Sequence, residues 1–168
     1  MDYEIREVSI EDAPHLCDIY NYYVENTSIS FEESPVSHEE MQSRIKQRAS
    51  HLPWLVLHSG GKVLAYAYAS PWRVRSAYRY SAESSVYVHN AYLQRGLGKL
   101  LYRSLIEKVR MARIRSLIGG IAMPNPASIA LHESLGFKKV AEFADVGYKF
   151  DQWLTVGYWQ LMLEPSVA

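Results

Sequence analysis

Hydrophobic positions recur with two different spacings along the chain, and each spacing predicts one kind of element. Short apolar runs bounded by turn residues predict strands at 3–8, 54–58, 63–70, 84–89, 116–121, 138–150 and 155–163. Apolar residues at every third or fourth position predict helices at about 10–25, 37–52, 98–112 and 127–135. This order of elements favours an α/β domain with one mixed sheet and helices on both of its faces.

Turn and cap residues mark several of these boundaries. Ser37, with Glu40 three residues later, has the pattern of a capping box at the start of the second helix, which is expected to end before Pro53. The sequence Ser-Gly-Gly-Lys at 59–62, between two apolar runs, predicts a β-hairpin. Gly136 is expected to stop the last helix in a left-handed conformation. A binding crevice is expected where a strand leads into a helix.

Composition narrows the class of protein. The chain has 168 residues, of which 48% are hydrophobic and 21% charged, as in an ordinary globular domain. Lys and Arg number 18 and so do Asp and Glu, which removes the broad attraction that non-specific nucleic-acid binding needs. No run approaches the ~20 apolar residues of a membrane span. We expect one soluble domain over 1–168, with 164–168 as a loose tail, and no nucleic-acid or membrane partner.

The cysteine and histidine residues indicate in which cellular compartment the protein works and whether it binds a metal ion. Cys17 is the single cysteine, so it has no partner for an internal disulfide, and the charged start of the chain lacks the apolar run of a secretory signal. A reducing, cytoplasmic location follows as the expectation. The histidines at 15, 38, 51, 58 and 89 lack metal-ligand spacing such as His-Glu-x-x-His, and we expect no metal.

The segment between the strand at 84–89 and the helix at 98–112 carries the most specific chemical signal. Gly96 and Gly98 lack a Cβ, so a ligand can lie against the backbone, and the free amides of a helix N-terminus attract a diphosphate. Arg95 and Lys99 would add positive charge. A tight turn without a ligand is the alternative. The glycine spacing fits neither the P-loop nor the dinucleotide fingerprint, which disfavours ATP and NAD.

Several motifs resemble one family. The residues Gln94-Arg95-Gly96-Leu97-Gly98 resemble the Q/R-x-x-G-x-G/A pyrophosphate loop of the GNAT superfamily of acetyl-coenzyme A N-acyltransferases. Segment 125–137, which ends in Leu-Gly-Phe, resembles the family's helix beside the coenzyme arm. Segments 83–89 and 147–154 are similar to its phosphinothricin and methionine sulfoximine N-acetyltransferase branch. The likeness extends over about 3–163 and departs from the branch at Pro126, often alanine there, and at Asp151-Gln152, often Gly-Arg.

This resemblance implies both a fold and an activity. The implied fold is a single GNAT-like domain with a mixed, mostly antiparallel sheet of about seven strands and about four flanking helices. The implied activity is transfer of an acetyl group from acetyl-CoA, as cosubstrate, to the α-amine of a small amino acid or analogue such as phosphinothricin or methionine sulfoximine. A peptide or protein amine or a polyamine is the alternative acceptor. A regulatory module that binds acetyl-CoA without catalysis is the alternative to an enzyme.

Two residues are assigned to catalysis by the resemblance. Glu83 would act as general base on the acceptor ammonium, directly or through water, whereas a solvated charge at the edge of a strand is the alternative interpretation. His132 occupies a position where many members have a tyrosine near the coenzyme sulfur, and it would protonate the leaving thiolate. A packed or surface histidine is the alternative.

Three groups of residues are assigned to the coenzyme in the same way. The backbone of Val86, Tyr87 and Val88 would pair with the pantetheine arm as an added strand, exposed where the sheet splays, and the amide near Val88 would polarise the thioester oxygen. Asn125 and Ser134 match coenzyme contacts, although each also fits a turn or a cap. The diphosphate is assigned to the loop residues Gln94, Arg95, Gly96, Leu97, Gly98 and Lys99.

The acceptor pocket is assigned by resemblance as well. Arg73, Val74 and Arg75 match substrate-contacting positions, and two arginines suit recognition of a carboxylate or phosphinate. A solvated basic loop or a nucleic-acid patch is the alternative. Phe31 and Glu32 resemble the opposite wall of the pocket, where Glu32 would face the substrate ammonium or, alternatively, be an exposed loop acid.

Lys149 and Trp153 resemble residues that the branch places near the cleft at a dimer interface, and Lys149 is assigned to the substrate site. Core packing is the stronger interpretation of Trp153. The 13 tyrosines and 4 tryptophans fit either a homodimer interface or an aromatic-rich core. A homodimer is the expected assembly.

Overall fold

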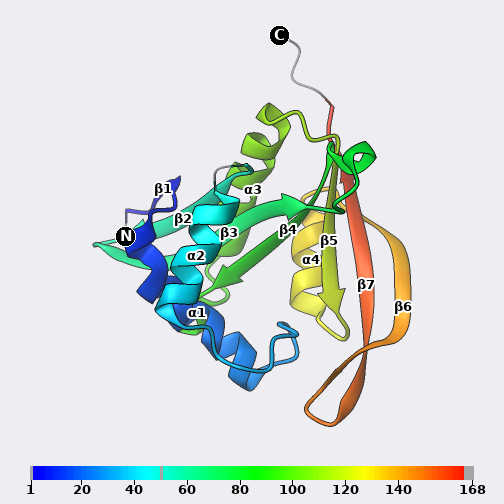
Figure 1. Ribbon diagram of the computed structural model, residues 1–168, viewed down its shortest axis with the longest axis horizontal. Helices are drawn as coiled ribbons and strands as arrows, with labels where there is room; N and C mark the ends of the chain where they lie inside the picture. The colour runs from blue at the N-terminus through cyan, green and yellow to red at the C-terminus, as the bar shows by residue number, and fades with distance from the viewer. Residues whose placement is uncertain (1, 50, 165–168) are drawn as a thin grey trace.

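The computed structural model describes residues 2–49 and 51–164. Within these residues, seven strands form one sheet in the order β1-β2-β3-β4-β5-β7-β6 (Figure 1). Neighbouring strands are antiparallel, except β4 and β5, which are parallel. The strands are β1 Glu4–Glu7, β2 Trp54–Ser59, β3 Lys62–Pro71, β4 Ser81–Val88, β5 Ser116–Ala122, β6 Lys138–Lys149 and β7 Gln152–Met162.

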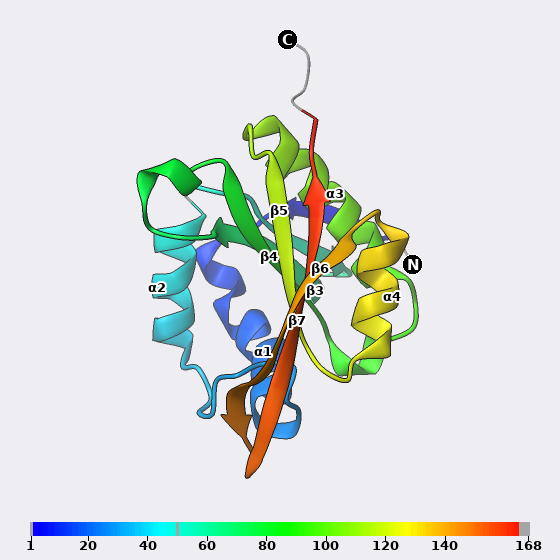
Figure 2. The same cartoon turned by 90° about the vertical axis from the view of Figure 1, so that its right-hand side faces the viewer.

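Helices cover both faces of the sheet. Figure 2 shows α1 and α2 on one side of the strands and α3 and α4 on the other. The α-helices are α1 Ala13–Asn26, α2 His38–Arg48, α3 Leu97–Met111 and α4 Pro126–Ser134. Short 3₁₀ turns lie at Ile10–Asp12, Ser76–Tyr78 and Asn90–Tyr92.

Strand β2 shows how the sheet serves two cores at once. Leu55 and Leu57 are buried in the cluster under α3, where Leu105 is also buried. Trp54 and Val56, which point to the other face, belong to the cluster under α1 and α2. Because successive side chains in a strand alternate between faces, a strand with helices on both sides must be apolar at every position.

The predicted fold class is confirmed, and each predicted helix and strand has a counterpart in the described residues. The starts of β4 and of the first helix differ from the prediction. Strand β4 begins at Ser81 rather than at 84, so that Glu83 lies inside the strand. The first helix opens as a 3₁₀ turn, and α1 itself begins at Ala13 with Pro14 in its first turn, where a proline interrupts no helical hydrogen bond.

The hairpin of β6 and β7 corrects one prediction. Phe150 and Asp151 adopt left-handed φ values of 51° and 56°, which form the tight two-residue turn that matches the twist of a hairpin. The turn pairs Lys149 with Gln152, so β7 begins three residues earlier than predicted. Trp153 therefore lies on the surface, 66% exposed, and the interpretation of this residue as core is wrong.

Three sequence predictions concern the tail, membrane-spanning helices and metal sites. Of the predicted tail at 164–168, residues 165–168 lie outside the described residues. Over 2–49 and 51–164, no helix combines the length and apolarity that crossing a membrane requires. No group of three or more His, Cys, Asp or Glu in these ranges is arranged to hold a metal ion.

Lys149 ties the hairpin to the end of α1. Its Nζ is buried and donates to the main-chain oxygens of Val24, Thr27 and Ser30, at 2.7, 2.9 and 2.7 Å. The last carbonyls of a helix have no partner inside the helix, so the ammonium acts as a distant C-terminal cap. Burial lowers the pKa of this amine, and the charges of Glu32 and Glu33 oppose that shift. The segment after α1 is thus held by a residue far along the chain.

Replacing Lys149 with methionine keeps the length of the side chain but leaves three main-chain acceptors without a donor. We expect the free energy of unfolding to fall by about 3 kcal/mol, since each buried unpaired acceptor costs ~1–3 kcal/mol and the loss of a buried charge offsets part of that cost. Urea denaturation measures the change. Lys138→Met, at an exposed position of the same strand, is the matched control. Equal midpoints for both variants and the wild type would contradict a structural role for Lys149.

Candidate functional site

The parallel pairing of β4 with β5 is short, and the site begins where it ends. Ser81–Glu83 pair with Ser116–Ile118, after which β4 continues along β3 and β5 continues along β7. Figure 1 shows the two strands diverging from that point. The sheet is therefore continuous at one end of β4 and open at the other.

Hydrogen-bond directions alternate along β4, so that every second residue faces the opening. His89 N donates to Leu64 O, which places the odd-numbered residues of β4 in the hydrogen-bonded pairs with β3. Val86 and Val88 therefore direct their main-chain N–H groups into the opening. The main chain of Tyr87 points to β3 instead, which corrects the expectation that it pairs with a coenzyme arm.

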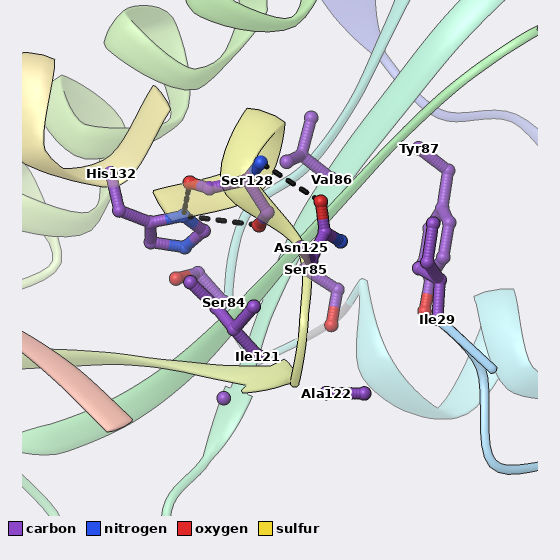
Figure 3. A pocket seen from close by; sticks show the side chains of 11 residues that line it. Ile29, Ser84, Ser85, Val86, Tyr87, Ile121, Ala122, Asn125, Ser128 and His132 are labelled. Atoms are coloured by element: carbon purple, nitrogen blue, oxygen red, sulfur yellow. Dashed lines mark hydrogen bonds between the residues drawn. The ribbon is translucent and has the colours of Figure 1, made fainter. Parts of the chain in front are cut away.

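A cavity of about 60 Å³ lies in the opening. In Figure 3, His132, Ser128 and Asn125 approach it from α4, while Tyr87 and Ile29 stand on the opposite side. The cavity is lined by Ile29, Ser84, Ser85, Val86, Tyr87, Gly120, Ile121, Ala122, Asn125, Ser128 and His132. Hydroxyl, amide and imidazole groups thus contribute much of the wall of this cavity, beside the aliphatic side chains of Ile29, Val86 and Ile121.

The loop before α3 presents free amides. Gln94 and Gly96 have left-handed φ values of 60° and 77°, and Gly96 is the N-cap of the helix. Leu100 N donates to Gly96 O, so the amides of residues 97–99 precede the first helical bond and have no partner within the helix. With the positive end of the helix dipole, these groups form a site for an anion such as a diphosphate.

The remaining loop residues have distinct surroundings. A Cβ on Gly98 would lie 3.4 Å from Val88 and 3.7 Å from Leu131, which are ordinary van der Waals distances, so packing alone does not require a glycine at this position. The guanidinium of Arg95 lies over the Tyr92 ring, 5.0 Å from its centre, and Lys99 is half-buried in the first turn of α3. Leu97 is a core side chain, which leaves only its amide for a ligand.

One position of the loop departs from the family pattern. In Q/R-x-x-G-x-G/A the polar residue stands three positions before the first glycine, and Leu93 occupies that place here. Gln94 falls one residue later. The glycines and the free amides fit the pattern, and its first polar side chain does not.

Helix α4 brings one of its two expected residues to the cleft. Asn125 lines the cavity, and its side chain caps the helix by accepting from Ser128 N at 3.1 Å. Ser134 lies at the other end of the helix, where its hydroxyl donates to Leu131 O at 2.9 Å. It lines a separate groove between α3 and β7. The structure therefore does not place Ser134 at the opening.

Glu83 lies beside the opening on the face of β4 that points to α1. Its side chain is half-buried, and burial raises the pKa of its carboxyl group while the nearby charge of Arg73 lowers it. A Cβ on Gly120 would lie 3.3 Å from Glu83 Oε1 and 3.2 Å from the Tyr158 ring. The glycine thus makes room for a carboxylate at the point where β4 and β5 separate.

A second cavity of about 450 Å³ continues from Glu83 toward α1. It is open to solvent, and its walls are mainly aromatic and aliphatic. The lining residues are Tyr20, Ile29, Ser30, Phe31, Glu32, Glu83, Ser85, Tyr87, Gly120, Ala122, Val156 and Tyr158. The two cavities share Ile29, Ser85, Tyr87, Gly120 and Ala122, so a ligand in one lies next to a ligand in the other.

Glu32 differs from the free acid that was expected. Arg44 donates to both of its carboxylate oxygens, at 2.8 and 2.7 Å, and the Tyr20 hydroxyl donates to it as well. The hydrogen bonds from Arg44 hold the pKa of the Glu32 carboxyl below its ordinary value. An acid already neutralised by a bidentate arginine contributes little attraction for a substrate ammonium. Phe31, in contrast, lines the cavity and lies against Gly147.

The segment after β3 carries the expected basic residues on the surface. Arg73 lies over the Trp72 ring, 4.1 Å from its centre, and is close enough to Glu83 to lower the pKa of that carboxyl. The side chain of Val74 is fully exposed, and Arg75 is exposed at the start of a 3₁₀ turn. Lys149, also assigned to the substrate, uses its ammonium in the three main-chain bonds described above.

Several residues at the site were missed from the sequence. Tyr102 occupies a core position of α3 by its spacing, yet its hydroxyl lies 3.1 Å from His132 Nε2 and 2.6 Å from Ser84 Oγ. Nothing in the helical pattern indicates that contact. The pair Gly119-Gly120 inside a strand was a usable signal, because glycine in a strand often marks the close approach of another group.

Comparison with known proteins gives the family. A model of the GNAT acetyltransferase domain matches residues 5–155. The phosphinothricin N-acetyltransferase of Streptomyces viridochromogenes is 36% identical over 157 residues, which span 94% of this chain and 86% of that protein. The L-methionine sulfoximine/L-methionine sulfone acetyltransferase of Pseudomonas aeruginosa is 36% identical over 168 residues, which span 99% and 98% of the two chains.

A solved structure gives the same result. The GNAT superfamily phosphinothricin acetyltransferase of Sinorhizobium meliloti, in complex with acetyl-CoA, superposes with a TM-score of 0.93 at 33% identity, covering 97% of this chain and 89% of that one. The match of the family model and the relatives extends over nearly the whole chain, and the chain belongs to the GNAT family of acetyltransferases.

Proposed function

We propose that this acetyltransferase moves the acetyl group of acetyl-CoA to the α-amine of a small amino acid or analogue such as phosphinothricin or methionine sulfoximine. The observation that carries the proposal is that two cavities, one in the opening between β4 and β5 and one beside α1, meet at a wall that includes Gly120, beside the carboxylate of Glu83, which lines the larger cavity. The names of the relatives described above support this choice of acceptor.

The coenzyme is proposed to lie along the opening. Its diphosphate would meet the free amides at residues 97–99, with Arg95 and Lys99 adding charge. The amide-containing pantetheine arm would pair with the main chain of Val86 and Val88 in the manner of an added strand. This arrangement carries the thioester to the narrow end of the opening, next to Glu83.

The acceptor is proposed to enter from the larger cavity. Glu83 takes one proton from its ammonium, and the free amine attacks the thioester carbon. The amide of Val86, the nearer to Glu83 of the two amides of β4 that face the opening, stabilises the oxyanion, and the C–S bond then breaks to release coenzyme A. Val88 is the last residue of β4 and lies five residues from Glu83, too far for the role that the sequence analysis gave to its amide. Arg73 and Arg75 would bind the α-carboxylate, while Phe31 and its aromatic neighbours would contact the side chain.

The assembly and the setting of the enzyme belong to the same proposal. The β6–β7 hairpin exposes an apolar surface, made of Phe143, Val146, Tyr148, Phe150 and Trp153, and we propose that a second copy of the chain covers it. The free thiol of buried Cys17 suits a reducing, cytoplasmic location. Acetylation removes the charge of an α-ammonium, which supports a role in detoxifying amino-acid analogues, including herbicides.

Glu83→Gln tests the catalytic base. The amide keeps the shape of the side chain but does not accept a proton, so kcat should fall by ~10² to 10⁴ while the Kd of acetyl-CoA stays unchanged. Because burial raises the pKa of Glu83, kcat/KM of the wild type should be lost as pH falls through a pKa above the ordinary range of a glutamate. Arg73→Gln removes the opposing charge and should move that limb to higher pH. An unchanged kcat in Glu83→Gln would remove Glu83 from the role.

Gly96→Val tests the placement of the coenzyme. Gly96 has φ +77°, and a branched side chain at this position strains the loop and projects toward the diphosphate. We expect the Kd of acetyl-CoA, measured by calorimetry, to rise by about tenfold or more. Gly60→Val is the matched control, because Gly60 has φ +57° and lies in the β2–β3 turn, away from the cleft. If both variants bind acetyl-CoA like the wild type, the proposed diphosphate site is wrong.

A panel of acceptors tests the substrate. Thiol release from acetyl-CoA is measured with phosphinothricin, methionine sulfoximine, methionine sulfone, ordinary amino acids, polyamines and peptide amines. We expect turnover only with small acids that carry a free α-amine, and Arg73→Gln/Arg75→Gln should raise their KM by about tenfold or more, as expected for the loss of charged hydrogen bonds of ~1.5–3 kcal/mol. Turnover confined to peptides or polyamines would overturn the acceptor. No turnover with any compound, despite normal coenzyme binding, would favour a regulatory module.

A further inference from the structure

Buried polar groups behind the cleft form one chain of hydrogen bonds that the steps above do not use. Ser84 Oγ lies 2.6 Å from the Tyr102 hydroxyl, which lies 3.1 Å from His132 Nε2. His132 Nδ1 lies 2.8 Å from the main-chain oxygen of Ser128. Tyr102 is fully buried, and His132 and Ser84 are 5% and 6% exposed. These hydrogen bonds connect β4, α3 and α4, which lie around the opening.

The chemistry of the groups fixes the direction of these bonds. A carbonyl oxygen only accepts, so the proton of a neutral His132 is on Nδ1, where it is donated to Ser128 O. Nε2 then has a lone pair and accepts from the Tyr102 hydroxyl. Because the Tyr102 proton goes to His132, the oxygen of Tyr102 accepts from Ser84 at 2.6 Å, and this bond competes with the longer contact of Ser84 Oγ with the main-chain oxygen of Ile118 at 3.3 Å. Burial lowers the pKa of His132, which agrees with a neutral ring.

The residues packed around the His132 imidazole hold it in a single orientation. A Cβ on Gly119 would lie 2.7 Å from His132 Cδ2, so the imidazole rests directly on the backbone of β5. The rings of Tyr102 and Phe137 lie edge-on to it, with centres 5.2 and 5.0 Å away. Rotation of the imidazole would break both of its hydrogen bonds and collide with these neighbours.

We propose that Tyr102 and Ser84 are positioning residues of the acetyl-transfer site, which hold His132 as the tautomer protonated on Nδ1. This inference rests on the proposed function. A ring held in this way has no proton on Nε2 to give to a thiolate, and it forms a fixed, neutral wall of the cleft. His132 therefore orients the thioester end of the coenzyme, and the acid role assigned to it from the sequence is replaced.

The protons of the reaction balance without His132. An acceptor ammonium that becomes an amide gives up two protons. One goes to Glu83 before the attack, and the other leaves the nitrogen of the tetrahedral intermediate and reaches the thiolate, directly or through water, as the C–S bond breaks. The products are the N-acetyl acid and coenzyme A as its thiol. Placing the base and the histidine on opposite faces of β4 fits this division.

The test is Tyr102→Phe, which keeps the ring and removes the hydroxyl. ¹⁵N NMR of the histidine-labelled protein reads the tautomer of His132 without any turnover. In the wild type we expect Nδ1 protonated and Nε2 unprotonated. In the variant, Nε2 has lost its donor, so the signals should move toward a mixture of tautomers, and kcat should fall by about three- to tenfold, as expected for one buried hydrogen bond. Tyr66→Phe, which removes a buried hydroxyl from the other core, should change neither the tautomer nor kcat.

His132 variants separate orientation from acid catalysis. Asparagine keeps an N–H donor near the position of Nδ1, whereas alanine keeps none. A positioning role predicts that His132→Asn retains several-fold more kcat than His132→Ala. Protonated Nε2 in the wild type, or equal losses of kcat in two folded variants, would overturn the proposal. Because the tautomer is read without turnover, a wild type that acetylates nothing would count against the proposed function and not against the hydrogen-bond chain.

Discussion

Parallel pairing between β4 and β5 joins Ser81–Glu83 to Ser116–Ile118 and extends no further, and the geometry of the site follows from that limit. On one side of the break, β4 remains bonded to β3 along its whole length, and on the other, β5 remains bonded to β7. The exposed groups of β4 are thus held rigidly in place although no strand covers them. An unpaired, preorganised strand edge binds a peptide-like arm without first having to order itself.

Successive side chains of β4 point to opposite faces of the sheet, so residues of this one strand contribute to different parts of the site. Glu83 and Tyr87 point to the α1 face and line the larger cavity, while Ser84 points to the α3 face and meets Tyr102. The main-chain groups of Val86 and Val88 point between these faces, into the opening. One strand therefore supplies the proposed base, the coenzyme-binding edge and the first member of the chain that holds His132. A shift of this strand by one residue would exchange all of these positions at once.

The sequence predicted the features that depend on local pattern. Periodicity gave the order of the elements, and the glycines at 96 and 98 marked the turn into α3, where we propose the diphosphate site. What it missed depends on contacts between distant segments. Lys149 caps a helix that ends more than a hundred residues earlier, and Glu32, in the loop before α2, is neutralised by Arg44 of that helix. Neither partner is visible from spacing. Trp153 was misassigned because aromatic content alone does not distinguish a core from a surface patch.

Amide hydrogen exchange with and without coenzyme A tests most directly whether the opening between β4 and β5 holds the coenzyme. We expect slower exchange at Val86 and Val88 and at residues 97–99, because their N–H groups would gain acceptors in the pantetheine arm and the diphosphate. The amide of Tyr87, already directed to β3, serves as an internal reference. Protection confined to another surface, such as the groove formed by Arg103, Leu135 and Leu163, with no change along β4, would contradict this account.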